Sequence, residues 1–435
     1  MKNTFYVSCP IDTYSGYGAR SRDFVKALIE LDKYDVRIVP QRWGTTPMNF
    51  IENHNEEWGF LKEYFSPPQL TEKPNIWCQI TVPNEFQPIG DYNIGLTAGI
   101  ETTACTHTWI EGCNRMNLIL TSSEHSKKVF ENTTFSGEDK QGNQKTTLKL
   151  EVPIEVLLEG ANLDVYKPLN TPMTNNELYK SIDSIPESFA FLFVGHWMQG
   201  DLGQDRKNVG LLIKAFYELF KNKTKKPALI LKTSQGGASY MDRREVQRKI
   251  EAIKKTLPTK NLPNVYLLHG EFSDEEMNEL YNHKKVKAMV SLTKGEGFGR
   301  PLLEFSLTNK PIITTGWSGH VDFLKPEFTA LVGGKLSNVH PSAANDFLLK
   351  EAQWFDADHG HVGHFINDFY NNYKEWKVKG KRQGYYSRTK FGFENMKTQM
   401  EEYFTKYLSS LPVQVELQMP DLNEIKLPKR KKVNG

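Results

Sequence analysis

Cysteine is scarce in this chain, and its spacing excludes several kinds of site. The 435 residues contain only four cysteines, none in a C-x-x-C pair: Cys9, Cys78, Cys105 and Cys113. So few cysteines in so long a chain predict reduced thiols and no disulfide framework. Cys105 and Cys113 lie near His107 and His125 in the sequence, but this spacing matches no standard structural zinc site.

Long hydrophobic runs and an excess of one charge are also missing. No stretch of about 18 apolar residues is present, so we expect no membrane span. The net charge is +3, which gives the whole molecule no strong field for a polyanion. Residues 1–3 lead directly into a predicted strand without a signal peptide, so we expect a cytoplasmic protein. With 38% hydrophobic and 25% charged residues, the composition is that of a globular protein with about two α/β domains.

The first 168 residues alternate between strand and helix. Strands at 4–8 and 35–39 flank a helix at 19–31, a βαβ unit that predicts a parallel sheet. Gly16 and Gly18 are expected in its first loop, where such sheets bind ligands. A dinucleotide fingerprint needs a third glycine where Ser21 stands, so NAD is not the favoured ligand.

More strands and helices follow in both halves. We predict strands at 94–97 and 118–121, a helix capped by Ser122 or Ser123, and a surface loop or hairpin tip over 134–147. The second half has strands at 189–194, 227–233 and 264–270, and helices at 209–220, 241–256 and 395–408. These elements divide the chain into a first domain (1–168), a linker (169–187), a second domain (188–380), a C-terminal helical segment (381–420) and a basic flexible tail (421–435).

The stretch "KGEGFGRPLLEFS", residues 294–306, carries the strongest chemical signal. A buried strand at 286–292 precedes it, and Pro301 begins a helix that stops near residue 309. Free backbone N–H groups and the helix dipole meet in the glycine loop, which suits a phosphate. Glu296 and Glu304 flank that spot, an arrangement suited to hydroxyl groups of a sugar and a ribose attached to the phosphate. The alternative is a surface loop with a solvated Glu296 and with Glu304 as a helix-dipole charge.

Four stretches in series resemble one family. "VPIEVLLEGANLDVYKP", "FLFVGH" with "RKNVGLLIKAF", "LLHGEFSDEEMNELY" and "EGFGRPLLE" are similar to segments of the retaining, nucleotide-sugar-dependent glycosyltransferases of family 4. The resemblance implies the α/β GT-B fold, in which two Rossmann-like domains with parallel sheets face a central cleft. It also implies a C-terminal helix that crosses back to the first domain.

The resemblance assigns roles to residues of the second domain. Glu296 would bind hydroxyls of the donor sugar, Glu304 would hold the ribose and Lys207 would bind the diphosphate. The diphosphate would also meet three backbone N–H groups, those of Gly297, Phe298 and Gly299. His196 stands where the family usually has an arginine, which makes Arg206, beside Lys207, the candidate second cation.

Other roles carry over more weakly. Gly16 and Gly18 match the first-domain loop that approaches the donor phosphates, and Phe272 and Tyr281 are candidates near the base. On the acceptor side the candidates are Glu101, His107, Asn84 and Glu85, of which Glu101 is favoured. A Glu101 that only caps a helix and a packed loop His107 are the structural alternatives.

The reaction implied is transfer of a sugar from a nucleotide-diphosphate sugar, with UDP as the first choice of nucleotide, to an acceptor hydroxyl with retention of configuration. The family needs no metal, which fits the lack of a D-x-D pair in a suitable loop, and no cofactor besides the donor substrate. The acceptor, whether glycan, protein or modified DNA, and the oligomeric state are left open.

Rival functions remain at this point. A glycoside hydrolase is disfavoured because its two carboxylates would flank a scissile bond and not a phosphate turn. A GT-B nucleotide-sugar epimerase is closer. The wording of "PIDTYSGYGARSRDFVKAL" resembles the large-phage branch of the family, so a DNA-modifying enzyme in the host cytoplasm is another alternative. A non-enzymatic nucleic-acid-binding module would use the basic tail "KLPKRKKVNG", for which a solvated terminus is the simpler reading.

Overall fold

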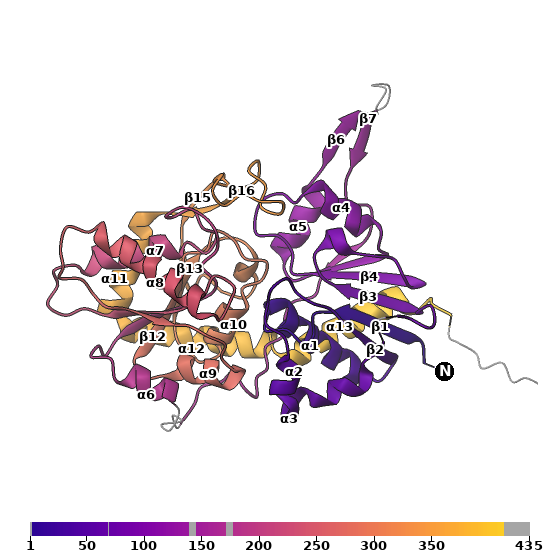
Figure 1. Ribbon diagram of the computed structural model, residues 1–435, viewed down its shortest axis with the longest axis horizontal. Helices are drawn as coiled ribbons and strands as arrows, with labels where there is room; N and C mark the ends of the chain where they lie inside the picture. Colours follow the sequence, from indigo (N-terminus) through magenta and orange to yellow (C-terminus); the bar gives the residue numbers. More distant parts are fainter. Residues whose placement is uncertain (1, 68, 139–144, 171–176, 413–435) are drawn as a thin grey trace, which may run out of the picture.

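The computed structural model describes residues 2–67, 69–138, 145–170 and 177–412, which form two α/β domains side by side (Figure 1). Each domain is built on a six-stranded sheet in which all neighbouring strands are parallel. This is the GT-B arrangement predicted from the sequence. The predicted basic tail, 421–435, lies outside the described residues.

The sheet of the first domain has the strand order β2-β1-β3-β4-β5-β8. Its strands are β1 (Thr4–Cys9), β2 (Asp35–Pro40), β3 (Ile76–Ile80), β4 (Tyr92–Thr97), β5 (Leu118–Thr121) and β8 (Ile154–Val156). Alternate residues of β1 face two different cores: Phe5 and Val7 pack in one cluster, while Tyr6 belongs to another. Both faces of this strand are therefore covered, and all six of its residues are buried.

Helices and short connections cover the first sheet. They are α1 (Gly16–Glu30), α2 (Phe50–Asn53), α3 (Asn55–Trp58), η1 (Gly59–Tyr64), η2 (Pro83–Glu85), α4 (His107–Asn114) and α5 (Glu124–Asn132). Ser123 caps α5, one of the two predicted positions, by accepting a hydrogen bond from the Ser126 N–H. The polar stretch 134–147 carries an antiparallel hairpin of β6 (Phe135–Glu138) and β7 (Lys145–Leu148), as predicted.

The prediction that Gly16 and Gly18 lie in a loop was wrong. Ser15 is the N-cap of α1, and its hydroxyl accepts a hydrogen bond of 2.9 Å from the Gly18 N–H. Both glycines therefore form the first turn of α1. A side chain at Gly18 would meet the Thr13 carbonyl oxygen at 2.3 Å, which explains the need for glycine there.

The second domain repeats this plan with the strand order β11-β10-β9-β12-β13-β14. Its strands are β9 (Ala190–Val194), β10 (Ala228–Lys232), β11 (Val265–Leu268), β12 (Val286–Ser291), β13 (Ile312–Thr315) and β14 (Ala330–Val332). Its helices are α7 (Val209–Phe220), α8 (Tyr240–Lys255), α9 (Asp274–Asn282), α10 (Arg300–Ser306), η3 (Gly319–Asp322), α11 (His359–Asn371) and α12 (Tyr373–Lys390). A separate antiparallel pair joins β15 (Gly334–Asn338) to β16 (Gln353–Ala357).

Two helices differ from the predicted domain boundaries. The stretch predicted as linker contains α6 (Glu177–Asp183), which buries Tyr179 and Ile182 and contacts α9. α12 continues through residue 380 to Lys390 and contacts α10 of the second domain. The crossing to the first domain comes after α12, next to Gly392.

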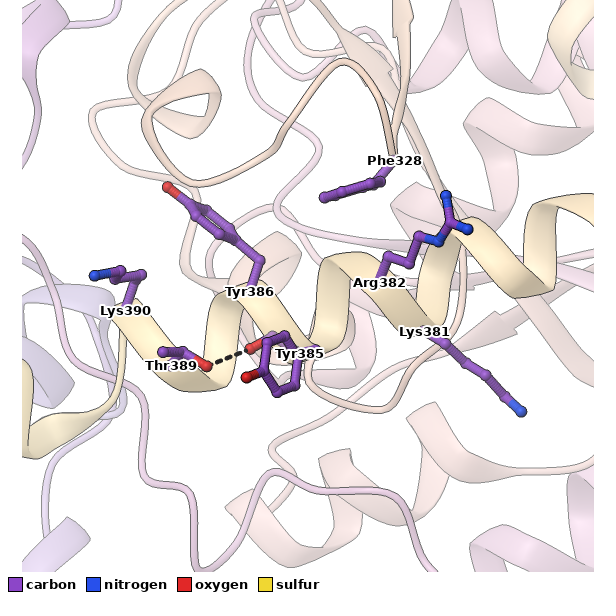
Figure 2. A pocket seen from close by; sticks show the side chains of 7 residues that line it. All are labelled: Phe328, Lys381, Arg382, Tyr385, Tyr386, Thr389 and Lys390. Carbon is purple, nitrogen blue, oxygen red and sulfur yellow. Dashed lines mark hydrogen bonds between the residues drawn. The ribbon is translucent and has the colours of Figure 1, made fainter.

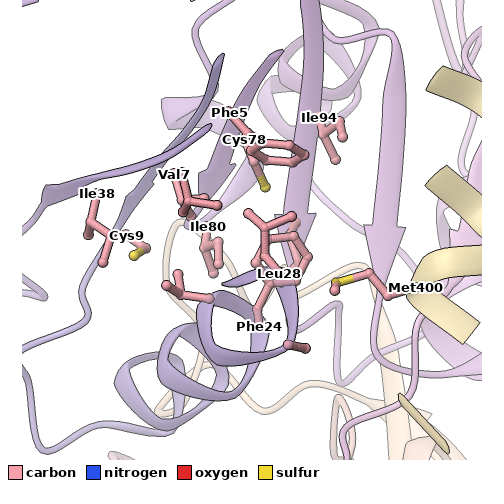
Figure 3. Packing of buried hydrophobic residues seen from close by; sticks show 14 of the residues in the cluster. Phe5, Val7, Cys9, Phe24, Leu28, Ile38, Cys78, Ile80, Ile94 and Met400 are labelled. Carbon is pink, nitrogen blue, oxygen red and sulfur yellow. The ribbon is translucent and has the colours of Figure 1, made fainter. Parts of the chain in front are cut away.

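The last described helix, α13 (Phe393–Leu408), crosses back to the first domain as predicted (Figure 1). Its buried residues Met396, Met400 and Phe404 belong to the same core cluster as β1 and α1. Figure 3 shows Met400 beside Phe24 and Leu28 of α1. None of the described helices is long and apolar enough to cross a lipid bilayer.

Candidate active site

The glycine loop between β12 and α10 lies where the two domains meet. Gly299 is the N-cap of α10 with φ of 97°, a left-handed conformation that favours glycine. Gly295 and Gly297 lie against the first domain, because an added Cβ would meet the Glu101 carbonyl oxygen at 2.0 Å and the Ala98 carbonyl oxygen at 2.3 Å. The loop therefore requires glycine both for its turn and for its close approach to residues 98–101.

A short segment before α7 holds two cations next to this loop. The Asp205 carboxylate accepts a hydrogen bond of 3.1 Å from the Val209 N–H at the start of α7. Arg206 and Lys207 lie between these two residues. The Lys294 N–H donates to the Arg206 carbonyl oxygen at 2.7 Å, so the backbone of the segment is fixed to the glycine loop.

Four predicted residues form one ion-pair cluster across the domain boundary. The Lys207 ammonium donates to both carboxylate oxygens of Glu296, at 2.5 and 2.7 Å. The Arg206 guanidinium lies 3.6 Å from Glu296 and 3.4 Å from Glu101 of the first domain. The side chains of Arg206, Lys207 and Glu296 are 12%, 14% and 9% exposed. Glu296 is therefore a buried, paired carboxylate, which argues against a solvated surface loop.

The cluster fixes the charges of its members. Burial opposes ionisation of Glu296, but Lys207 and Arg206 outweigh it and lower the pKa of Glu296 to about 2. Burial lowers the pKa of Lys207, and Glu296 offsets part of this effect. Burial also lowers the pKa of Arg206, but Glu101 and Glu296 outweigh this effect, so that the pKa of the guanidinium is raised overall. With a pKa of about 2, Glu296 is ionised at neutral pH and forms an ion pair with Lys207.

The backbone of the glycine loop keeps donors available. The Glu296 N–H donates to the Ser318 hydroxyl at 2.9 Å, and its carbonyl accepts from the Gly319 N–H at 3.0 Å. Within the described chain, no hydrogen bond engages the three N–H groups that follow, those of Gly297, Phe298 and Gly299. The Phe298 side chain is buried and packs on Phe323, with ring centroids 4.9 Å apart. Only the backbone of Phe298 is thus available to a ligand.

Glu304 belongs to a second ion-pair cluster, which the motif did not reveal. The Arg300 guanidinium donates to Glu304 at 2.8 Å and to Asp23 of α1 at 2.6 Å, and lies 3.7 Å from Glu159. Burial raises the pKa of Glu304 to about 8; Arg300 offsets only part of this effect, and the negative charges of Asp274 and Asp23 add to it. Tyr281, a candidate near the base, is fully buried with its hydroxyl 3.5 Å from Glu304. Its phenol therefore packs behind Glu304 and is not open to a base.

His196 lies in the loop after β9, with its Nδ1 3.1 Å from the Ser234 hydroxyl. Desolvation, together with the nearby Lys207 and Lys232, lowers the pKa of His196, so that its imidazole is neutral at pH 7. Lys232 lies 4.7 Å from the centroid of the Phe272 ring and donates to the Gly270 carbonyl at 2.7 Å. Lys232, which was not a sequence candidate, thus connects the His196 and Phe272 loops.

On the first domain, Tyr17 orders the segment that faces the glycine loop. Its hydroxyl lies 3.0 Å from the Thr97 hydroxyl and accepts a hydrogen bond of 3.0 Å from the Ala98 N–H. The ring stacks on Trp43 with centroids 4.0 Å apart. Gly16, the residue before Tyr17, is exposed at the start of α1, with open space where a side chain would be.

The other acceptor-side candidates lie elsewhere. His107 is exposed at the start of α4 and packs edge-on against the Phe135 ring of the hairpin. Asn84 and Glu85 are in η2, where the Asn84 carbonyl accepts from Arg115 and the Glu85 carboxylate from Thr81. Of the four candidates only Glu101 has a contact with the Arg206 cluster.

The match to known families is confined to the second domain. Residues 198–344 match the family model of the glycosyl transferases group 1. The matched stretch contains Arg206, Lys207, Glu296 and Glu304, so both ion-pair clusters include residues from it. No curated protein sequence matches the chain.

Solved glycosyltransferase structures share the whole fold. HepE from Anabaena, in complex with UDP and glucose, has a TM-score of 0.61 at 12% identity, covering 93% of this chain and 100% of HepE. Sucrose-phosphate synthase from Thermosynechococcus elongatus has a TM-score of 0.60 at 11% identity, covering 94% and 100%. A glycosyltransferase from Rickettsia africae has a TM-score of 0.59 at 13% identity, covering 94% and 99%. At these identities the likeness concerns the fold, which extends over both domains.

Proposed function

We propose that the protein is a metal-independent glycosyltransferase that moves a sugar from a UDP-sugar to an acceptor hydroxyl with retention of configuration. The observation that carries the proposal is the ion-pair cluster of Lys207, Arg206, Glu296 and Glu101, beside three backbone N–H groups that no described residue engages. The group 1 match over 198–344 supports the transferase class. The complex of the similarly folded HepE with UDP and glucose supports UDP-sugars as the first donors to test.

In this proposal the cluster exchanges its partners when the donor binds. Lys207 and Arg206 turn from Glu296 to the diphosphate, and the N–H groups of 297–299 donate to its oxygens. The Glu296 carboxylate is then free to accept hydrogen bonds from the sugar hydroxyls. The stabilising groups are in place before reaction, which is the most productive electrostatic arrangement for a leaving group that gains negative charge.

The bond changes are those of sugar transfer. The bond between the sugar's anomeric carbon and the β-phosphate oxygen breaks, and the acceptor oxygen forms a new bond to that carbon. The two cations stabilise the charge that develops on the departing UDP. The acceptor attacks from the face of the sugar that the phosphate leaves, and the proton of its hydroxyl passes to that phosphate. In this proposal Glu101 of the first domain, 3.4 Å from Arg206, faces the acceptor. Holding both substrates in the interdomain site supplies much of the remaining acceleration.

The test is nucleotide release from a panel of UDP-, GDP-, ADP- and TDP-sugars, measured with and without chelator. We expect release from one donor, unchanged by chelator, and a loss of about 100-fold or more in Glu296→Ala and Lys207→Ala. Glu56→Ala and Lys225→Ala are matched controls, since both residues are exposed and lie outside the cluster. If no donor releases nucleotide and calorimetry detects no donor binding, the proposal is wrong.

A further inference from the structure

Helix α12 presents a cationic stripe on the surface of the second domain. Its sequence, "YKEWKVKGKRQGYYSRTK", has seven lysines and arginines and one glutamate. Lys374, Lys377, Lys381 and Tyr385 recur at intervals of three and four residues, which places them on one side of the helix. All four are exposed.

The bases of α12 lack carboxylate partners within the part of the chain that the structure describes. None of the seven takes part in a salt bridge there, whereas Lys397 of α13 pairs with Glu394 and Glu30. α8 is also rich in bases, but there Arg248 pairs with Glu245 at 2.6 Å and Lys254 with Glu251 at 3.3 Å. Like charges three and four residues apart repel one another along a helix, so a bound polyanion would relieve this repulsion.

Aromatic rings form a cavity beside the stripe. In Figure 2 Tyr386 and Arg382 project from α12 toward the side on which Phe328 lies. All three residues line one cavity. The cavity has a volume of about 470 Å³. The Lys325 ammonium lies 4.9 Å from the centroid of the Tyr386 ring, and Tyr385 is 70% exposed on the same helix.

We infer that this surface binds single-stranded nucleic acid, with phosphates along the α12 stripe and a base in the cavity between Phe328 and Tyr386. Cationic side chains that follow a backbone, interleaved with rings that stack on bases, are the recurring means of binding single strands. A lipid surface fits less well. The rings line a hollow, and the two large apolar residues exposed on α12, Val378 and Tyr385, are too few to form a continuous apolar face. The inference goes beyond the proposed transfer reaction and does not depend on it.

The test uses the full chain and a fluorescein-labelled oligothymidylate, with binding followed by fluorescence anisotropy at about 50 and about 200 mM salt. We expect Lys381→Glu/Arg382→Glu to weaken binding about tenfold or more and to reduce the salt slope by about 1.4, the value for two lost phosphate contacts. Arg243→Glu/Arg244→Glu on α8 changes the net charge equally and should leave most of the affinity. This control also separates the stripe from the basic tail, which both variants retain.

A second variant tests the contribution of the rings. Tyr385 lines the same cavity as Phe328 and Tyr386 and is exposed. Tyr385→Ala removes this ring and should weaken oligothymidylate binding about fivefold while leaving the binding of inorganic polyphosphate unchanged. Three outcomes overturn the inference: no binding by the wild type, equal losses in the α12 and α8 double variants, or equal effects of Tyr385→Ala on both polyanions. Binding to phosphatidylserine vesicles in preference to the oligonucleotide would also reject it, in favour of a membrane surface.

Discussion

At the scale of single residues, Lys207 and Glu296 depend on each other more than on any other partner. Both are buried, and the ammonium contacts both carboxylate oxygens. Removing one member of a buried pair leaves the other charge uncompensated, which is costly in a poorly hydrated site. The pair therefore supports the fold of the site as well as its proposed chemistry.

Lys207→Met should lower the free energy of unfolding by about 3 kcal/mol at pH 7, since Glu296 keeps only the more distant Arg206. The variant should also raise the pKa of Glu296. In the wild type the folded-state pKa of about 2 lies below the ordinary glutamate pKa of 4.5, so this stabilisation is complete above pH 4.5 and is lost as the pH falls toward 2. Urea unfolding from pH 3 to pH 7 measures both effects. Lys225→Met, an exposed site, should change stability by less than about 0.5 kcal/mol; an equally stable Lys207→Met would contradict the buried pair.

Glu304 should give the opposite pH dependence. Its folded-state pKa, about 8, lies above the ordinary glutamate pKa of 4.5, so between these two pH values the folded state holds a proton that the unfolded state has lost. The contribution of Glu304 to stability therefore falls as the pH rises from 4.5 through 8. Glu304→Gln keeps the shape of the side chain and removes the titration. The loss of stability between pH 6 and pH 8.5 should be smaller in Glu304→Gln than in wild type, and coincident profiles in urea unfolding would refute this assignment.

The sequence predicted the site residues that lie in local motifs better than those whose partners are distant in the chain. Lys207 and Glu296 lie in motifs whose strand–loop–helix context fixes where they point. Arg300 was not singled out, because its partner Asp23 lies 277 positions away and only the docking of the domains joins them. Tyr281 is in the right segment, but the packing of α9 on α10 turns its ring inward.

At the scale of elements, α13 joins the two domains by supplying part of the first domain's core. Phe404 is 2% exposed and contacts the rings of Phe5 and Tyr34, with centroids 5.5 and 6.1 Å apart. The helix comes from the end of the chain, yet it completes a core that begins with β1. The first domain therefore cannot fold to full stability without the C-terminal segment.

Phe404→Ala should lower the free energy of unfolding by about 3–5 kcal/mol, the range for large-to-small changes in a packed core. Thr405→Ala changes the neighbouring exposed residue and should cost less than about 0.5 kcal/mol. Chemical denaturation followed by tryptophan fluorescence measures both. If Phe404→Ala and Thr405→Ala unfold at the same denaturant concentration, α13 does not contribute to the core of the first domain.

Apolar patterns predicted part of each sheet and missed many other elements. Strands such as β1, β5, β9 and β12 are short apolar runs that were predicted, and α13 was predicted as a helix, whereas β3, β13 and β14 and the helices α4, α9, α11 and α12 were not. α6 was not predicted in the polar linker, because its buried Tyr179 and Ile182 make an apolar face only when α9 is present. Gly16 and Gly18 read as loop residues, but the Ser15 cap starts a helix at that point.

At the scale of the whole molecule, the domains are held together by charges that also belong to the site. Arg300 reaches Asp23 at 2.6 Å, and Arg206 reaches Glu101 at 3.4 Å. Each guanidinium has another partner within its own domain, Glu304 in one case and Glu296 in the other. Loss of Asp23 and Glu101 would therefore weaken the docking of the domains, while Arg206 keeps Glu296 and Arg300 keeps Glu159 as a partner.

Asp23→Asn/Glu101→Gln should accordingly fold normally but rest in a more open arrangement. We expect a larger radius of gyration than wild type in small-angle X-ray scattering, because two of the three interdomain ion pairs of Arg206 and Arg300 are gone and only the 3.7 Å pair of Arg300 with Glu159 is left. Glu56→Gln/Asp32→Asn makes the same charge change at exposed positions and should leave the radius unchanged. Near-ultraviolet circular dichroism checks that both variants keep their packed cores.

Bound donor gives a further test of the open arrangement. Because ligands bound between two lobes favour closure, a saturating concentration of donor should reduce the difference in radius of gyration between variant and wild type. An unchanged radius in the unliganded Asp23→Asn/Glu101→Gln variant would mean that the remaining interdomain contacts hold the domains closed, among them the Arg300–Glu159 pair and the approach of Gly295 and Gly297 to residues 98–101.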